Sequence, residues 1–83
     1  MKVLYFAWLR TRVGHAEDQV ELPKGVSDVR GLIDHLKTKG PNYAEALKDL
    51  NTVRVAVNHD YVKLDHRLKP TDEVALFPPV TGG

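Results

Sequence analysis

The residues of this sequence that could do chemistry most directly are its last two, Gly82 and Gly83. Neither carries a side chain, so the carboxylate of Gly83 stands on a backbone that can pass through a narrow channel and adopt most dihedral angles. Pro78 and Pro79 stiffen the approach and lack a backbone N–H, which favours an extended tail over further sheet. We expect the carboxyl group of Gly83 to be the reactive group. The alternative is a tail without function, such as a cloning remnant.

The side chains offer little other chemistry. The sequence contains no cysteine, which excludes a disulfide framework, a thiolate metal site and a catalytic thiol. Asp65 and His66 are adjacent, but no nucleophile stands at a recognisable spacing from them. Asp72 and Glu73 should point to opposite faces of a strand and so share no site. The histidines show no metal-ligand spacing and are expected to be solvated: His15, His35, His59 and His66. We therefore expect a carrier-like body without catalytic groups and without a bound metal.

Composition limits the class of protein. With 83 residues, the chain can form one small domain with a layer of helix on one sheet. Lysine and arginine number 12 against 11 acidic residues, so charge gives no reason to expect nucleic acid or a membrane as a partner. The apolar runs fall short of the roughly 18 residues that a membrane-spanning helix needs. The start is typical of a strand and not of a signal peptide, and the lack of cysteine suits a reducing compartment, so we expect a cytoplasmic protein.

The first half of the sequence predicts two strands and two helices. Residues 3–9 are rich in β-branched, aromatic and aliphatic side chains, and residues 19–23 alternate between polar and apolar, so the two segments should form a hairpin. A helix should follow an N-cap at residues 27–28, with apolar residues at helical spacing and a stop at residues 40–41. A shorter second helix is expected over residues 43–50.

The second half predicts strands. Residues 53–57 alternate as a half-buried strand should, a turn leads to a returning strand over residues 61–64, and a polar turn precedes a last strand over residues 74–77. The order of elements predicts an α+β domain with a mixed sheet and the helices on one face. We expect one domain over residues 1–79 and a flexible tail over residues 80–83.

Counting with a period of two assigns the strand residues to two faces of the sheet. The face under the helix receives Val3, Tyr5, Ala7, Val53, Val55, Val57, Val62, Leu64, Val74 and Leu76. The opposite face receives Leu4, Phe6, Trp8, Tyr61, Ala75 and Phe77. A face that met only water should be polar, so this apolar face predicts a protein interface with aromatic anchors. The alternative is a register error of one residue, which would place some of these rings in the core.

Two parts of the sequence resemble the MoaD family, the small subunits of molybdopterin synthase. The first is the opening segment over residues 3–7 with Arg10 and residues 13–14. The second is closer and comprises residues 55–58, 65–66 with Leu68, 72–75, and the run Phe77-Pro78-Pro79-Val80-Thr81-Gly82-Gly83. The resemblance implies a ubiquitin-like β-grasp domain that acts as a sulfur carrier. Residues 27–52 agree in pattern only.

The resemblance also implies partners and chemistry. An activating enzyme of the ubiquitin-activating type would use ATP to adenylate Gly83, and a persulfide donor would convert that carboxylate to a thiocarboxylate. The tail would then enter the large subunit of molybdopterin synthase, in a heterotetramer with two copies of each chain, and sulfur would pass to cyclic pyranopterin monophosphate. No cofactor would be bound stably, and catalysis would belong to the partners.

Carried over by position, Gly83 would bear the sulfur and Gly82 would be the small neighbour that a channel requires. Partner contacts would come from Phe6, Arg10, Tyr61, Phe77, Pro78, Pro79, Val80 and Thr81. Trp8 departs from the family, in which a smaller or polar residue is expected, and Tyr61 is bulkier than the usual aliphatic residue.

Three other hypotheses remain open at this stage. A carrier of the same fold could serve thiamine synthesis or tRNA thiolation, although the Phe-Pro-Pro-Val-Thr run argues for the first reading. A ubiquitin-like protein modifier would join Gly83 to lysines of target proteins, because its activation chemistry is the same and only the acceptor differs. A plain interaction module would bind through its sheet and make no use of its terminus.

Overall fold

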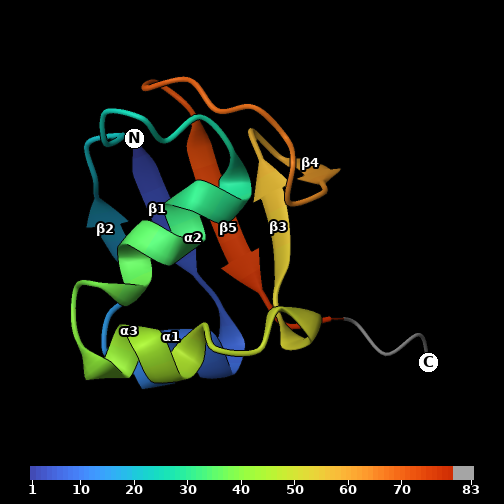
Figure 1. Cartoon of the computed structure of the whole chain (residues 1–83). Coiled ribbons are helices and arrows are strands. Elements are labelled where there is room, and N and C mark those ends of the chain that lie inside the picture. Colours follow the sequence, from blue (N-terminus) through green and yellow to red (C-terminus); the bar gives the residue numbers. More distant parts are fainter. Residues whose placement is uncertain (80–83) are drawn as a thin grey trace.

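The computed structural model describes residues 1–79, which form a five-stranded sheet with helices (Figure 1). The strand order across the sheet is β2-β1-β5-β3-β4. Strand β5 (Glu73–Phe77) therefore lies in the middle, between β1 (Lys2–Tyr5) and β3 (Arg54–Val57). Strands β2 (Glu17–Gln19) and β4 (Asp60–Val62) form the two edges. The tail expected over residues 80–83 lies outside the described residues.

The sheet is mixed, as predicted, because its first and last strands run parallel. Val3 of β1 pairs with Val74 of β5, and every other neighbouring pair of strands is antiparallel. A parallel pair needs a long crossover, and here the crossover carries the helices that follow β2. Val3, Val74 and Leu76 have no exposed surface, so the centre of the sheet is also the centre of the core.

Helix α2 (Val29–Lys37) covers one face of the sheet (Figure 1). The predicted N-cap is confirmed, because the side chain of Asp28 accepts a hydrogen bond of 2.9 Å from the backbone N–H of Gly31. The apolar residues predicted at helical spacing are fully buried: Val29, Leu32, Ile33 and Leu36. Burial of each such side chain contributes about 1.5–3 kcal/mol, which makes this face the main support of the helix.

The second predicted helix is divided in two. Helix α3 (Pro41–Ala46) begins directly at the expected stop signal, with Gly40 as its N-cap and proline in the first helical position. A single 3-10 turn, η1 (Leu50–Thr52), follows it. Pro41 therefore marks the boundary between α2 and α3. Inside a helix its missing N–H would cost a hydrogen bond, whereas at a helix start that N–H would have no partner in any case.

The clearest difference from the prediction lies directly after β1. The strand expected over residues 3–9 ends at Tyr5, and helix α1 (Ala7–Val13) follows. Ala7 makes the sharp turn with a φ of 55°, a left-handed conformation that costs a residue with a Cβ about 1–2 kcal/mol. Because the strand ends early, Ala7 and Trp8 lie on neither face of the sheet, and the predictions that placed them there are wrong.

Burial at helical spacing explains why this segment is a helix. Leu9 and Val13 stand four residues apart and are both buried, and the helix packs against α3. Gly14 ends it with a φ of 100°, and its N–H donates to the carbonyl of Arg10 at 2.9 Å. Strand preference is worth about 1 kcal/mol across the whole scale, whereas burial of one leucine is worth more. Tertiary packing therefore decides the outcome.

The predicted hairpin forms, but with its second strand earlier than expected. The prediction placed that strand over residues 19–23, whereas β2 pairs Gln19 with Lys2 and Glu17 with Leu4. The ladder continues for one bond, from the N–H of Val20 to the carbonyl of Met1 at 2.9 Å. Helix α1 accounts for this register. It extends to Val13 with Gly14 as its C-cap, so only a short connection remains before β2 begins at Glu17.

The second half of the chain follows the prediction closely. Strands β3 and β4 are joined at Asn58 and His59, whose φ values of 51° and 73° are those of a tight hairpin turn. Strand β4 is shorter than expected and ends at Val62. Strand β5 begins at Glu73, one residue before the predicted start.

A buried carboxylate joins the last turn to this hairpin. Asp72 is 8% exposed and accepts a 2.8 Å hydrogen bond from the N–H of Lys69 and a 3.0 Å bond from the side-chain amide of Asn58. The carbonyl of that amide accepts from the N–H of Glu73 at 3.0 Å. The hydrogen bond from the Lys69 backbone holds the pKa of Asp72 below its usual value, against the opposing effect of burial.

Replacing this carboxylate should destabilise the domain. Asp72→Asn puts an amide N–H₂ where an oxygen now accepts, and we expect a loss of about 1–3 kcal/mol at pH 7 in urea unfolding. The pKa of Asp72 is lower in the folded protein than in the unfolded chain, where an aspartate has a pKa of about 3.9. The contribution of this carboxylate to the free energy of unfolding is therefore present above about pH 3.9 and disappears as the pH falls through the pKa of the folded state. The difference between wild type and Asp72→Asn should therefore shrink below about pH 4.

Asp65→Asn is the matched control, since Asp65 is an exposed turn residue. It should unfold within about 0.5 kcal/mol of wild type. Equal stabilities for Asp72→Asn and Asp65→Asn at pH 7 would contradict the role given to the Asp72 carboxylate.

Candidate functional site: the outer sheet face and the end of strand β5

The sheet face opposite α2, which we call the outer face, carries a row of residues that crosses all five strands. The register places Glu17, Leu4, Ala75, Ala56 and Tyr61 side by side in that order. Tyr61 is 81% exposed, and Ala56 beside it is nearly buried. Small side chains in the middle and a large ring at the edge make this face flat and apolar on the β4 side.

The aromatic residues gather at one corner of the outer face. The rings of Tyr61 and Phe77 lie 5.5 Å apart between centroids, with their planes inclined at 39°. Arg54 pairs with Phe77 in the sheet register, and together with Val55 and Val62 these three residues line a hollow. The guanidinium of Arg54 donates to the carbonyls of Asn51 and Val53, both at 3.3 Å.

Strand β5 ends at this corner. The N–H of Phe6 donates to the carbonyl of Leu76 at 3.1 Å, so the start of α1 is bound to the end of β5. Phe6 is 48% exposed, while Phe77, Pro78 and Pro79 are half-buried. In Figure 1, β5 ends beside the 3-10 turn η1, and the described chain leaves the sheet there. Together Phe6, Tyr61 and Phe77 give this exit an aromatic rim.

The predicted site residues divide into three groups. Phe6, Tyr61 and Phe77 lie around the exit of β5, and Pro78 and Pro79 follow it. Arg10 is exposed on α1 and lines a different hollow, which includes Thr11, Gly14 and His15 but none of those aromatic residues. The predicted residues Val80, Thr81, Gly82 and Gly83 lie outside the described part of the chain.

A second cluster of polar groups joins β1, β2 and α3, and the sequence did not indicate it. The hydroxyls of Tyr5 and Tyr43 each donate to Asp18 Oδ2 at 2.8 Å. His15 Nε2 lies 2.7 Å from the Tyr43 hydroxyl oxygen and 2.9 Å from Asp18 Oδ1. Because the Tyr43 hydrogen is directed to Asp18, Nε2 carries the hydrogen that these two oxygens share. The spacing of three residues between His15 and Asp18 is the one local signal that could have indicated part of this contact.

This cluster stabilises the fold and offers no nucleophile. Burial and the hydrogen bond to Asp18 raise the pKa of Tyr5 far above its usual value and that of Tyr43 to about 12. Burial acts to raise the pKa of Asp18, but the hydrogen bonds from His15 and the tyrosines outweigh it and the pKa is lowered. The carboxylate stays charged and the hydroxyls stay neutral, which is the arrangement of a fixed structural network.

Within residues 1–79, no group of three or more histidine, aspartate or glutamate side chains could hold a metal ion. Over the same residues, no helix has both the length and the apolar character to cross a membrane.

The strand order, the central last strand and the aromatic exit define a ubiquitin-like β-grasp domain. A solved structure of small archaeal modifier protein 1 from Haloferax volcanii superposes with a TM-score of 0.76 and 28% identity, covering 100% of this chain and 98% of that one. The chain belongs to the ThiS family, whose model matches residues 3–83.

Curated relatives agree over the whole length. The molybdopterin synthase sulfur carrier subunit of Escherichia coli is 42% identical, covering 100% of this chain and 99% of the relative. The subunit of the same name from Haemophilus influenzae is 36% identical with the same coverage. The resemblance to small subunits of molybdopterin synthase that the sequence suggested is confirmed.

The buried tyrosines predict a loss of stability at alkaline pH. The pKa values of Tyr5 and Tyr43 are higher in the folded protein than in the unfolded chain, where a tyrosine has a pKa of about 10. Their contribution to the free energy of unfolding is therefore complete below about pH 10 and is lost as the pH rises above it. Thermal unfolding followed by circular dichroism between about pH 8 and pH 11 should show a falling midpoint. Tyr5→Phe should be less stable at pH 8 and should lose less on going to pH 11.

Tyr61→Phe provides the control, because it removes a hydroxyl from a ring that is 81% exposed. Its midpoint should follow the wild-type curve. A Tyr5→Phe curve parallel to wild type across this range would refute the role of the cluster.

Proposed function

We propose that this chain is the sulfur carrier subunit of molybdopterin synthase and acts in molybdenum cofactor biosynthesis. The observation that carries the proposal is the 42% identity to the Escherichia coli subunit of that name over essentially the full length of both chains. The aromatic exit of β5 supports it, because it provides a docking surface directly beside the segment that would carry the sulfur.

The reactive group would be the carboxylate of Gly83. A carboxylate is a poor electrophile, so an activating enzyme of the ubiquitin-activating type would first attach AMP from ATP to it, which makes one oxygen a good leaving group. A persulfide donor would then attack the activated carbonyl through its outer sulfur and displace AMP, which gives an acyl disulfide. A thiol would reduce the S–S bond of that disulfide and release the thiocarboxylate, while the thiol and the donor sulfur end as a disulfide. In the large subunit, the sulfur would pass to cyclic pyranopterin monophosphate, and two such transfers would build the dithiolene of molybdopterin.

The described residues would contribute binding and positioning. Tyr61 and Phe77 present adjacent rings to a partner, and aromatic side chains are the usual anchors of such contacts. Pro78 and Pro79 have no backbone N–H, so the chain beyond β5 is directed away from further pairing in the sheet. Gly82 would be the small neighbour that lets the terminus enter a narrow site. Arg10 would make a separate basic contact on α1.

The catalytic groups would belong to the partners. We propose a heterotetramer with two copies of this chain and two of the large subunit, and a transient complex with the activating enzyme. We propose a cytoplasmic protein that binds neither nucleic acid nor membrane, and in which ATP is consumed by the activating enzyme and not bound stably by this chain.

A ubiquitin-like protein modifier is the second candidate. The similarity in structure to small archaeal modifier protein 1 favours it, because the name of that protein describes a modifier and the folds agree over both chains. The two functions share the activation of the Gly83 carboxylate. They differ in the group that attacks the activated carboxyl, which is a persulfide in the sulfur carrier and a lysine side chain of a target protein in the modifier.

Activation of the chain should leave a defined change in mass. Incubation with the activating enzyme, ATP and a persulfide donor should add about 16 Da, because one sulfur replaces one oxygen. Intact-protein mass spectrometry measures this change, and tandem fragmentation should assign it to Gly83. Deletion of Gly83 should abolish it.

The same samples separate the two candidates. A modifier would instead appear in covalent conjugates of higher mass that persist in reducing denaturing gels and are lost with Gly83. An unchanged mass in the presence of an activating enzyme that modifies the Escherichia coli subunit would refute the carrier function.

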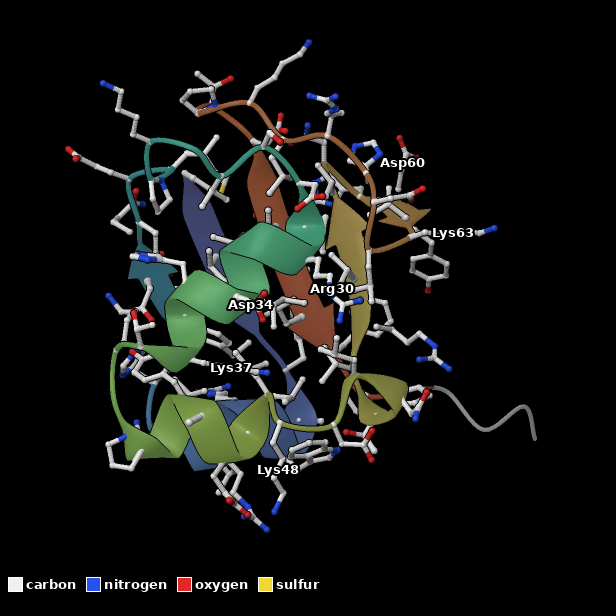
Figure 2. All side chains as sticks on the ribbon, viewed as in Figure 1. Arg30, Asp34, Lys37, Lys48, Asp60 and Lys63 are labelled. Atoms are coloured by element: carbon white, nitrogen blue, oxygen red, sulfur yellow. The ribbon has the colours of Figure 1, made fainter. Side chains whose placement is uncertain are left out.

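The outer face should contribute directly to binding of the large subunit. Tyr61→Ser removes an 81% exposed ring, so we expect little change in thermal stability and a loss of binding of tenfold or more, measured by isothermal titration calorimetry. The control is Asp34→Ser on the exposed face of α2, which Figure 2 shows in front of the sheet, on the side away from the outer face. It should bind as wild type, and equal losses in both variants would argue against docking through the outer face.

A further inference from the structure

A second surface near the exit of β5 has no role in the function proposed above. Trp8 is 39% exposed on α1 and stands at the head of a groove between α1, α3 and η1. We call it the Trp8 groove; it is lined by Trp8, Arg12, Glu45, Ala46, Lys48, Asp49 and Thr52. An exposed indole beside charged side chains has the composition of a protein contact, in which a large ring is the anchor and the rim is polar.

Ion pairs connect the charged side chains of the groove. Lys48 donates to Glu45 Oε1 at 2.8 Å, and the same oxygen lies 3.8 Å from a guanidinium nitrogen of Arg12. Asp49 caps the 3-10 turn by accepting from the N–H of Asn51 at 3.0 Å. Both signs of charge are therefore present in the groove beside Trp8. In Figure 2 the labelled Lys48 lies at the end of the molecule formed by α1 and α3.

The strand order brings this groove to the exit of β5. Strand β5 is flanked by β1 and β3, and the chain passes from β1 into α1 and from η1 into β3. Phe6, two residues before Trp8, is bound to the carbonyl of Leu76. Thr52, on the opposite wall, is two residues before Arg54, the sheet partner of Phe77. Both walls of the groove therefore continue into residues that contact the end of β5.

The short reach of the tail requires a partner to come close to this place. Gly83 is four residues beyond Pro79, and at about 3.3 Å per residue it reaches at most about 13 Å from it. An active site that receives Gly83 must therefore approach the exit of β5 closely. A recessed site has walls on more than one side of the chain that enters it, and one of these walls would face the α1 side of the exit.

The area needed for a stable complex points the same way. A standard interface takes about 800 Å² from each partner, roughly one seventh of the 5287 Å² surface of this chain. The aromatic corner of Phe6, Tyr61 and Phe77 is too few residues for such an area, since about 20–30 residues a side are usual. The Trp8 groove extends this corner past Phe6 along α1.

We propose that the Trp8 groove is a second contact surface for the large subunit of molybdopterin synthase. An apolar side chain of that subunit would pack on the indole of Trp8. An acidic side chain of the subunit would pair with Lys48, and a basic one with Asp49. The inference rests on the proposed function, because the large subunit is the partner that forms a lasting complex. In the proposed function the activating enzyme would be released after each reaction, and such transient contacts use the smaller areas. Trp8 is then a residue that determines partner specificity.

The single tryptophan makes a direct test possible with the wild-type sequence. Protein labelled with 5-fluorotryptophan has one fluorine resonance, from Trp8, whose solvent exposure is measured by its shift between H₂O and D₂O. When the unlabelled large subunit is added and the complex is verified by gel filtration, the resonance should move and the solvent-induced shift should fall to less than half.

Each other result overturns the inference in a distinguishable way. A complex that forms while the resonance keeps its position and exposure refutes the groove and leaves the carrier function intact. A resonance that responds to the activating enzyme but not to the large subunit refutes the choice of partner. Absence of any complex with a large subunit that binds the Escherichia coli carrier refutes the proposed function, and the inference with it.

Variants add a quantitative test. Trp8→Gln should weaken binding of the large subunit about tenfold to a hundredfold, as expected for loss of a central aromatic anchor, and Trp8→Phe should recover part of the loss. Asp34→Gln is the control, because Asp34 is exposed on α2, away from the groove and from the exit of β5. Thermal unfolding of all three variants verifies that they fold. If Trp8→Gln folds and binds the large subunit as tightly as Asp34→Gln does, the proposal is overturned.

Discussion

The pairing of β5 with β1 on one side and β3 on the other is the interaction on which the rest of the structure depends. It places the last strand of the chain in the middle of the sheet, where Val74 and Leu76 are fully buried. A segment that follows an edge strand would hang from a part of the fold that opens easily, because edge strands have one ladder only. Here the chain leaves from the most firmly held strand, so the surfaces around its exit have fixed positions relative to it.

The two faces of the sheet divide the work between stability and recognition. The inner face, with α2 against it, contains nearly all of the buried apolar surface. The outer face keeps small residues in its centre and exposed rings at the corner where β5 ends. Because strand side chains alternate, every residue that anchors β5 in the core has a neighbour that faces outward. The same strand therefore secures the fold and presents Phe77 to a partner.

Polar groups secure the parts of the domain that the core does not reach. The carboxylate of Asp72 joins two turns at one end of the sheet, and that of Asp18 joins β2 to Tyr5 and Tyr43 at its edge. In both places the carboxylate keeps a lowered pKa because donors surround it. These networks use the ionisable groups of the described chain for structure, in keeping with a carrier whose reactions would take place on its partners.

The sequence by itself determined the elements with strong local signals: helix α2 with its Asp28 cap, the hairpin turn at Asn58, and the outward position of Tyr61 and Phe77. Local spacing and alternation are sufficient for these, since each follows from residues close together in the chain. The order of the elements predicted the mixed sheet, although its parallel pair joins the two ends of the chain. Tertiary structure alone decided that residues 7–13 form a helix, that Trp8 lies in a groove and not on the sheet, and that His15, Asp18 and Tyr43 meet. Each of these depends on contacts between residues far apart in the sequence, such as the packing of α1 on α3. The free energy of that burial exceeds local preference, and a period read along one segment does not contain it.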